Sequence, residues 1–168
     1  PRSRGLGDVY KRQFLHTITF GLFFNKTQTV TITAEDAGSG VKDVAYFVSD
    51  KALTLEEVKA MDDWSTYTGK FGIVPDAQVV IYAKASDHAG NVSYISSDGM
   101  ILKNTAPVIS GVKNGETYYG DQIVTVTDPH LDSVKLDGQT VALTNGQLTV
   151  PADNARHTIE AVDKAGNV

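Results

Sequence analysis

Short segments of the chain alternate between hydrophobic and polar residues, which is the pattern of a β-strand with one buried face. Near residue 30, one valine, one isoleucine and one alanine alternate with three threonines. We therefore expect the first hundred residues to form a β-rich domain. The expected strands are Ile18–Phe24, Gln28–Ala34, Val41–Ser49, Gln78–Ser86 and Val92–Leu102, with another extended stretch at Trp64–Phe71.

One helix is expected to interrupt these strands. Thr54 is a residue that favours the N-cap position, and Glu57 follows three residues later, so the pair forms the sequence signature of a capping box. Leu53 and Val58 occupy the positions on either side that form a hydrophobic staple. The pattern predicts a short helix over Leu55–Met61.

Shorter strands follow a proline-containing linker at Lys103–Pro107. The residue before a proline favours extended geometry, so the linker is expected to be stiff. Short strands separated by turn residues are typical of a β-sandwich. The five period-two pairs are Val124 and Val126, Val134 and Leu136, Val141 and Leu143, Leu148 and Val150, and Ile159 and Ala161. Turn signals lie between them at Asp128, Asp137, Asn145 and Asp153.

The apolar members of these patterns form the predicted core. They are Val30, Ile32, Val44, Tyr46, Val48, Val79, Ile81, Ala83, Val124, Val126, Val134, Leu136 and Ile159.

One phrase occurs twice in the chain. Residues Ala85–Val92 return as Ala161–Val168, displaced by 76 residues, and both copies read Ala-x-Asp-x-Ala-Gly-Asn-Val. A repeat at this spacing indicates two copies of one small domain. In the first copy the phrase leads into a further strand, so we expect the second domain to lack its last strand, which would lie beyond residue 168.

The repeated phrase has two interpretations. In a tight turn, the aspartate accepts main-chain hydrogen bonds and the glycine and asparagine tolerate positive φ. The turn residues are then Asp87, Gly90, Asn91, Asp163, Gly166 and Asn167. Alternatively, Asp87 or Asp163 could be a carboxylate ligand of calcium. Calcium takes six to eight oxygen ligands, and a single aspartate per turn supplies too few, so we favour the turn and expect neither metal nor cofactor.

Composition excludes several classes of protein. The chain has no cysteine, so it holds no disulfide and no cysteine-based zinc or redox site. Its net charge is −5, but the first thirteen residues carry four basic side chains against one acid, which leaves −8 for the remainder. A body this acidic repels nucleic-acid phosphates. No apolar run reaches transmembrane length, and neither a catalytic motif nor a phosphate-binding loop is present, so we do not expect an enzyme.

The first residues have an unusual character. Ser3–Gln13 resembles the translation of a DNA adaptor used in transposase-based sequencing libraries, read in one open frame. We therefore expect residues 1–13 to be a non-native tail that is excluded from fold reasoning. The natural sequence would then begin near Phe14, and the chain would be a fragment of a longer protein.

A family resemblance rests on three stretches: the repeated phrase, Asp36–Val41 with the sequence Asp-Ala-Gly-Ser-Gly-Val, and the Asn104–Pro107 opening. Together they resemble bacterial immunoglobulin-like repeat domains of secreted and wall-anchored Firmicutes proteins. The resemblance implies an all-β fold of two tandem immunoglobulin-like β-sandwiches, residues 14–104 and 105–168. The first would carry the short helix as an insertion, and the second would be truncated at its C-terminus.

The resemblance implies an extracellular, cell-wall-associated protein of a Gram-positive bacterium. The leading hypothesis is a non-catalytic spacer whose partners are neighbouring domains of the same chain. The alternatives are an adhesin module that binds a glycan or a host surface protein, and an accessory domain of a polysaccharide-degrading enzyme. Trp64 and Tyr67 are the candidate glycan-stacking residues, but we favour the interpretation that Trp64 closes the sandwich core under the helix, since buried aromatic residues contribute strongly to cores. Neither nucleic acid nor membrane insertion is expected.

Overall fold

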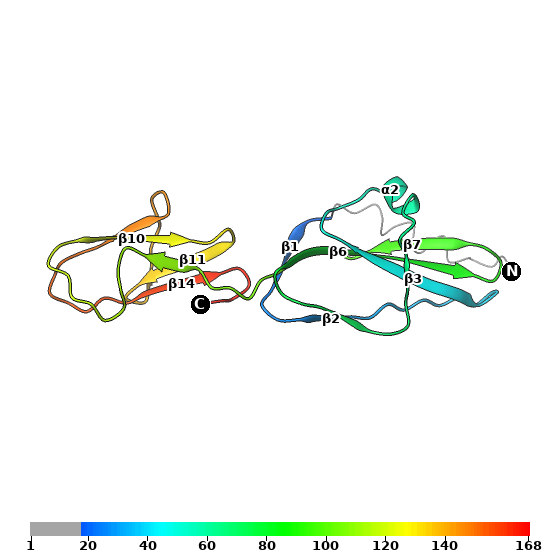
Figure 1. The fold of residues 1–168 in the computed structure, drawn as a ribbon, viewed down its shortest axis with the longest axis horizontal. Helices are drawn as coiled ribbons and strands as arrows, with labels where there is room; N and C mark the ends of the chain where they lie inside the picture. Colours follow the sequence, from blue (N-terminus) through cyan, green and yellow to red (C-terminus); the bar gives the residue numbers. More distant parts are fainter. Residues whose placement is uncertain (1–17) are drawn as a thin grey trace. The chain divides into compact units, whose positions relative to one another are not determined.

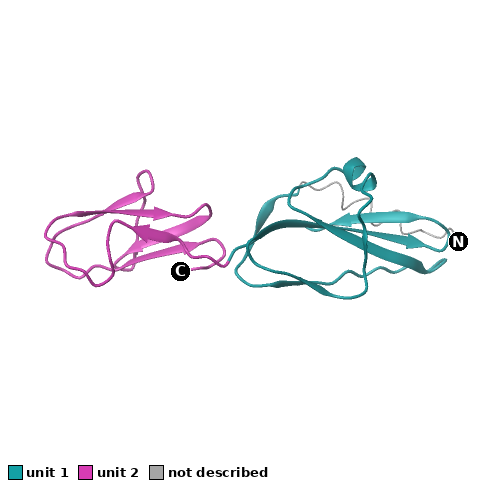
Figure 2. Cartoon of the chain, viewed as in Figure 1, with its two compact units in different colours: residues 1–103 teal, residues 104–168 magenta. Residues whose placement is uncertain are grey.

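A computed structural model of the chain describes residues 18–168. The expected non-native tail, residues 1–13, lies outside the described residues. The chain forms two compact units, one extending to Lys103 and the other comprising Asn104–Val168 (Figure 2). In both, the regular secondary structure is almost entirely β-strand (Figure 1). The all-β prediction is therefore confirmed.

The larger sheet of unit 1 is organised around its longest strand, β6 (Ala77–Asp87), which pairs with β3 on one edge. The strand order is β1, β8, β6, β3 and β4, and β7 also pairs with β6. The bounds of these strands are β1 Phe20–Phe24, β3 Val41–Ser49, β4 Ser65–Thr66, β7 Val92–Ser96 and β8 Gly99–Leu102. A second, two-stranded sheet consists of β2 (Gln28–Val30) and β5 (Phe71–Ile73).

The predicted strand Val92–Leu102 consists of two strands, β7 and β8, which pair with successive parts of β6. The interruption lies at Ser97. Its hydroxyl accepts a hydrogen bond from the main-chain nitrogen of Ile81 at 2.9 Å, and its own nitrogen donates to the Ile81 carbonyl oxygen at 2.8 Å. A side chain thus replaces one backbone group of the ladder. The alternation of hydrophobic and polar residues does not reveal that a side chain takes the place of a backbone group at this point.

Both faces of β6 are covered, and its residues 79–83 are all buried. On one face, Phe47, Val80 and Tyr82 pack with Val58 of α2 (Leu55–Lys59). On the other, Tyr46 stacks on Phe71 of β5 at 4.2 Å between ring centroids. Figure 1 shows α2 on one side of β3 and β6, with β2 on the other. Residues 79–83 of β6 are accordingly apolar without alternation, as in strands buried on both faces, so one-sided alternation underestimated the burial of this strand.

The helix α2 begins where the sequence predicted. The main-chain nitrogen of Thr54 donates to a carboxylate oxygen of Glu57 at 2.7 Å, and the nitrogen of Glu57 donates to the Thr54 hydroxyl at 3.3 Å. The capping box is thereby confirmed. The hydrogen bonds that the Thr54 nitrogen and the Thr54 hydroxyl donate to the Glu57 carboxylate hold the pKa of Glu57 below its ordinary value. The helix ends at Lys59 rather than Met61, because Ala60 serves as its C-cap.

Unit 2 consists of two three-stranded sheets that enclose one core, as in a β-sandwich. One sheet has the order β13 (Gln147–Val150), β10 (Gln122–Thr127) and β9 (Val108–Ser110). The other has the order β12 (Gln139–Thr140), β11 (Leu131–Leu136) and β14 (Ile159–Asp163). The buried core residues come from both sheets: Val124, Val126, Val134, Leu148, Val150 and Ala161.

Several sequence-based expectations were wrong. Val141 and Leu143 lie in no strand, although both are half-buried against the core of unit 2. The strand expected over Gln28–Ala34 ends at Val30, and the main-chain nitrogen of Ile32 donates to the Tyr67 hydroxyl at 3.1 Å. These segments have strand-like composition, but strand pairing depends on a partner that local sequence does not specify.

Among the predicted core residues, Val48 is 41% exposed, whereas Phe47 beside it is buried. Alternation assigns Val48 to a face of β3 but does not indicate how far that face is covered. The buried predicted core residues are Val79, Ile81, Ala83, Val124, Val126 and Val134. The half-buried ones are Val30, Ile32, Val44, Tyr46, Leu136 and Ile159.

Candidate functional site

The first candidate, Asp87, lies at the end of β6 with 6% of its surface exposed. One carboxylate oxygen accepts from the main-chain nitrogen of Asn91 at 2.8 Å, and the other accepts from the Asn91 side-chain amide at 2.7 Å. The Asp87 nitrogen donates to the Asn91 carbonyl oxygen at 3.1 Å. These hydrogen bonds between Asp87 and Asn91 close the turn between β6 and β7.

Asp163 makes the same contacts at the end of β14 and is 2% exposed. Its carboxylate accepts from the nitrogen of Asn167 at 2.9 Å, from the side-chain amide of Asn167 at 2.8 Å and from the nitrogen of Ala165 at 3.0 Å. Its own nitrogen donates to the Asn167 carbonyl oxygen at 3.1 Å. The repeated phrase thus folds in the same way in both units.

The glycine of each phrase has a backbone conformation that side chains disfavour. Gly90 has φ of +90° and Gly166 has φ of +85°, both in the left-handed region. The nitrogen of each glycine donates to the carbonyl oxygen of the aspartate three residues earlier, at 3.2 Å for Gly90 and 3.0 Å for Gly166. A turn of this form needs glycine at that position.

The carboxylates in these turns are engaged by donors of the turn itself. The Asn91 side-chain amide is the main cause that holds the pKa of Asp87 below its ordinary value, against burial, which acts in the opposite direction. A calcium ion would have to compete with these donors, and it would need several further oxygen ligands. Residues 18–168 contain no group of three or more His, Cys, Asp or Glu side chains placed to hold a metal ion.

The strands that position the two aspartates are also equivalent. In unit 1, Val41 pairs with Asp87, and a bulge follows before Asp43 pairs with Ser86. In unit 2, Leu131 pairs with Asp163, and a bulge follows before Ser133 pairs with Val162. Register and irregularity are therefore the same. Val41 and Leu131 are 90 residues apart, whereas Asp87 and Asp163 are 76 residues apart. The segment between the two paired strands is therefore 14 residues longer in unit 1, where it contains α2.

Trp64 is partly buried and packs against the core cluster under α2. Its ring nitrogen donates to the carbonyl oxygen of Met61 at 2.8 Å, and its ring meets that of Phe47 edge-on at 4.8 Å. The Lys84 ammonium lies 4.4 Å from the ring centroid, a cation–π geometry. A sugar would need an open ring face, and these contacts instead give Trp64 a packing role.

Tyr67 lies on the opposite face of the sheet. Its ring meets Tyr46 at 6.2 Å and Phe71 at 6.5 Å, both edge-on. Because Tyr46 and Phe47 are consecutive in β3, their side chains point to opposite faces. The structure therefore does not bring Trp64 and Tyr67 together as one glycan platform.

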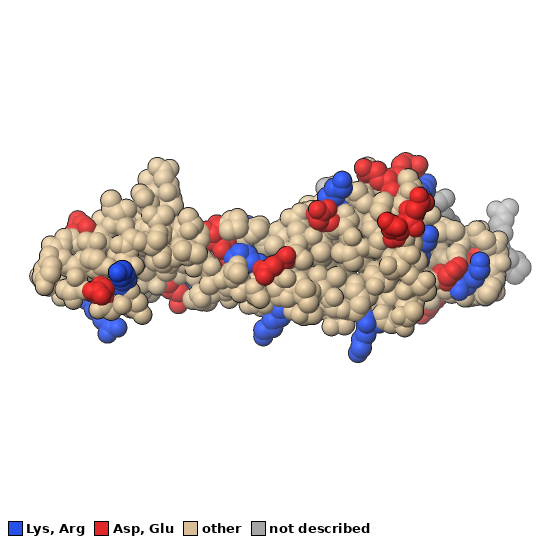
Figure 3. All heavy atoms as spheres, viewed as in Figure 1, with Lys and Arg blue, Asp and Glu red and all other residues tan. Residues whose placement is uncertain are grey.

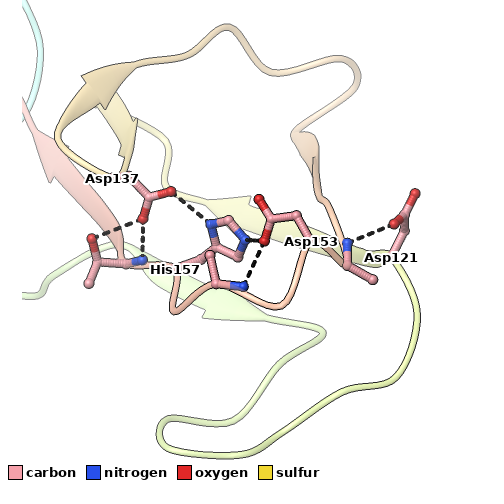
Figure 4. Close-up of polar contacts among 7 residues, drawn as sticks. Asp121, Asp137, Asp153 and His157 are labelled. Carbon is pink, nitrogen blue, oxygen red and sulfur yellow. Dashed lines mark hydrogen bonds and ion pairs between the residues drawn. The ribbon is translucent and has the colours of Figure 1, made fainter.

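Sequence reasoning missed one cluster of titratable groups in unit 2. His157 lies between two carboxylates: its Nδ1 is 2.7 Å from Asp137, and its Nε2 is 2.9 Å from Asp153 (Figure 4). Asp137 also accepts from the nitrogen of Thr158 at 2.7 Å, and Asp153 accepts from the nitrogen of Ala155 at 2.9 Å. We call Asp137, Asp153 and His157 the histidine clasp.

The clasp joins the β11–β12 turn to the loop before β14. The hydrogen bond to Asp137 is the main cause that raises the pKa of His157, and the same bond lowers the pKa of Asp137. The pKa of Asp153 is lowered chiefly by the nitrogen of Ala155. The only sequence signal was the assignment of Asp137 and Asp153 to turns, and nothing local connected His157 to them.

Acidic side chains gather around α2 on the face of unit 1 that Figure 3 shows. The acidic residues Glu56 and Glu57 belong to the first turn of the helix, where their negative charges interact favourably with the positive end of the helix dipole.

Across residues 18–168, no helix has both the length and the apolar character needed to cross a membrane. Neither protein-family models nor the curated proteins include a match to this chain.

Proposed function

We propose that the two units are tandem immunoglobulin-like modules that act as non-catalytic spacers in a large extracellular protein of a Gram-positive cell wall. The observation that carries the proposal is the equivalence of the two units. Each has the same Asp-Asn turn, at Asp87 and at Asp163, on strands of the same register. Repetition of one small module is the architecture by which bacterial surface proteins separate a distal domain from the wall.

Each unit has a hydrophobic core of its own. Val58, Val80 and Tyr82 belong to the core of unit 1, and Val124 and Val134 belong to that of unit 2. A short segment, Lys103–Pro107, connects the units. A domain with a hydrophobic core of its own can in principle fold alone, so we expect each unit to keep its fold when the other unfolds.

Single-molecule pulling of the complete chain between terminal handles tests this proposal. We expect two separate unfolding events, one for each unit. The variant Val124→Ala should lower the unfolding force of one event and leave the other unchanged, because Val124 is fully buried in unit 2 alone. A single cooperative event would contradict modular behaviour. Saturable binding to a member of a glycan panel would instead support the adhesin alternative and overturn the spacer role.

A further inference from the structure

The strands that end in the two aspartates, β6 and β14, differ in how many partner strands they have. In unit 1, β6 pairs with β3 on one edge and with β7 on the other. In unit 2, β14 pairs with β11, and within the described residues it is the edge strand of its sheet. Since β3 and β11 are equivalent in register, the unpaired edge of β14 corresponds to the edge of β6 that carries β7.

The hydrogen-bonding groups on this edge can be assigned by alternation. In β6, the nitrogens of Ile81 and Asp87 bond to Ser97 and Asn91, so the odd-numbered residues point toward β7 and its flanking residues. In β14, the nitrogen of Asp163 bonds to Asn167 in the same direction. The main-chain groups of Ile159 and Ala161 therefore point away from β11.

A groove of about 500 Å³ is lined by residues of the edge strands β9 and β14, together with Lys135 of β11 and Gly138 of the turn that follows it. Pro107, Ile109, Ile159, Ala161 and Val168 supply its apolar lining. Ile109 pairs with the buried Val126 and so points into the sandwich, yet it is 36% exposed. The apolar side of unit 2 is thus partly exposed beside the main-chain groups of Ile159 and Ala161 that point away from β11.

We infer that this edge accepts one further strand, antiparallel to β14 and delivered through the Asp163–Asn167 turn, in the register that β7 has on β6. An extended strand is the occupant that satisfies both features, because its backbone pairs with β14 while alternate side chains close the apolar groove. The strand in unit 1 places Ser93 opposite Ala85 and Ile95 opposite Ala83. The equivalent positions in β14 are Ala161 and Ile159.

The inference goes beyond the spacer role and does not depend on it. An unpaired edge next to an apolar groove is a template for association with other chains. The added strand is expected to remove that template and to complete the sandwich of unit 2.

The experiment extends the full chain after Val168 with a copy of Ser93–Ser97, which comprises β7 from its second residue and the Ser97 that follows it. Amide hydrogen exchange is then followed by NMR at Ile159 and Ala161. The extension should slow exchange at both positions by about tenfold or more. Glu160 and Val162, whose nitrogens face β11, serve as internal references, and Val126 in β10 reports whether unit 2 stays folded.

The matched control carries the same extension with its isoleucine replaced by proline, which removes a ladder donor. The control should leave exchange at Ile159 and Ala161 as it is in the original chain. Equal rates in the two extended chains would overturn the inference. The inference would also be overturned if, in the original chain, amide exchange at Ile159 and Ala161 became slower as the protein concentration rose. A second copy of the chain would then occupy the edge.

Discussion

The carboxylate of Asp163 accepts hydrogen bonds from both the main-chain nitrogen and the side-chain amide of Asn167, at 2.9 and 2.8 Å. Asp87 and Asn91 repeat this relationship at 2.8 and 2.7 Å. A buried carboxylate is tolerated because the donors of its own turn replace its hydration. The repeated phrase is therefore the means by which each unit closes the end of the strand that carries its aspartate, β6 or β14.

Removal of the Asp163 carboxylate should weaken unit 2. The variant Asp163→Ala leaves two main-chain donors and one amide donor of the turn without their acceptor. We expect a loss of about 2 kcal/mol in the free energy of unfolding. As a control, Asp132→Ala at an exposed position should not measurably change the free energy of unfolding. The chain has a single tryptophan, Trp64 in unit 1, so a calorimetric transition without a change in tryptophan fluorescence belongs to unit 2.

Removal of the Tyr82 hydroxyl should weaken unit 1. This side chain is fully buried, and its oxygen accepts from the main-chain nitrogen of Leu53 at 2.6 Å. The variant Tyr82→Phe leaves that nitrogen without its partner, at a cost of about 1–2 kcal/mol. Urea unfolding followed by Trp64 fluorescence measures the change. Tyr119→Phe is the control, since Tyr119 is 99% exposed, and an equal loss in both variants would contradict the prediction.

Alanine substitutions at two glycines of unit 2 distinguish the effect of backbone strain from that of steric overlap. Gly111 and Gly115 have φ of +97° and +82°, so alanine at either position costs about 1–2 kcal/mol in backbone strain. At Gly111 the added Cβ would also overlap the main-chain carbonyl oxygen of Ile123, whereas at Gly115 nothing lies within 4 Å. Thermal unfolding should therefore show a larger loss for Gly111→Ala than for Gly115→Ala. Equal losses would refute the predicted overlap.

The histidine clasp should give unit 2 a stability window in pH. The ordinary pKa values are 6.5 for His157 and 3.8 for Asp137 and Asp153. Because the pKa of His157 is raised, its contribution is complete below pH 6.5 and is lost as pH rises through the raised value. Because the carboxylate pKa values are lowered, their contribution is complete above pH 3.8 and is lost as pH falls through the lowered values.

Calorimetry across the pH range tests this window. The melting temperature of unit 2 should be highest between pH 3.8 and 6.5 and should decline on either side. The variant His157→Gln should remove the decline on the alkaline side, whereas His88→Gln in unit 1 should leave it in place. If His157→Gln retains the full alkaline decline, the clasp is not its cause.

The strands that the sequence located best are those with uninterrupted alternation or a local signature. Val41–Ser49 coincides with β3, and Thr54 with Glu57 located the first residue of α2. The repeated phrase located the two aspartate turns. Each of these features depends on residues within a few positions of one another, whose backbone geometry and hydrogen bonds are decided locally.

The sequence by itself determined the all-β class, the helix start and the equivalence of Asp87 with Asp163. The tertiary structure alone decided that β6 is covered on both faces, that Trp64 and Tyr67 lie on opposite sides of a sheet, and that His157 joins Asp137 to Asp153. The physical reason is distance along the chain. Alternation specifies which side chains share a face, but coverage of that face depends on packing partners from distant segments.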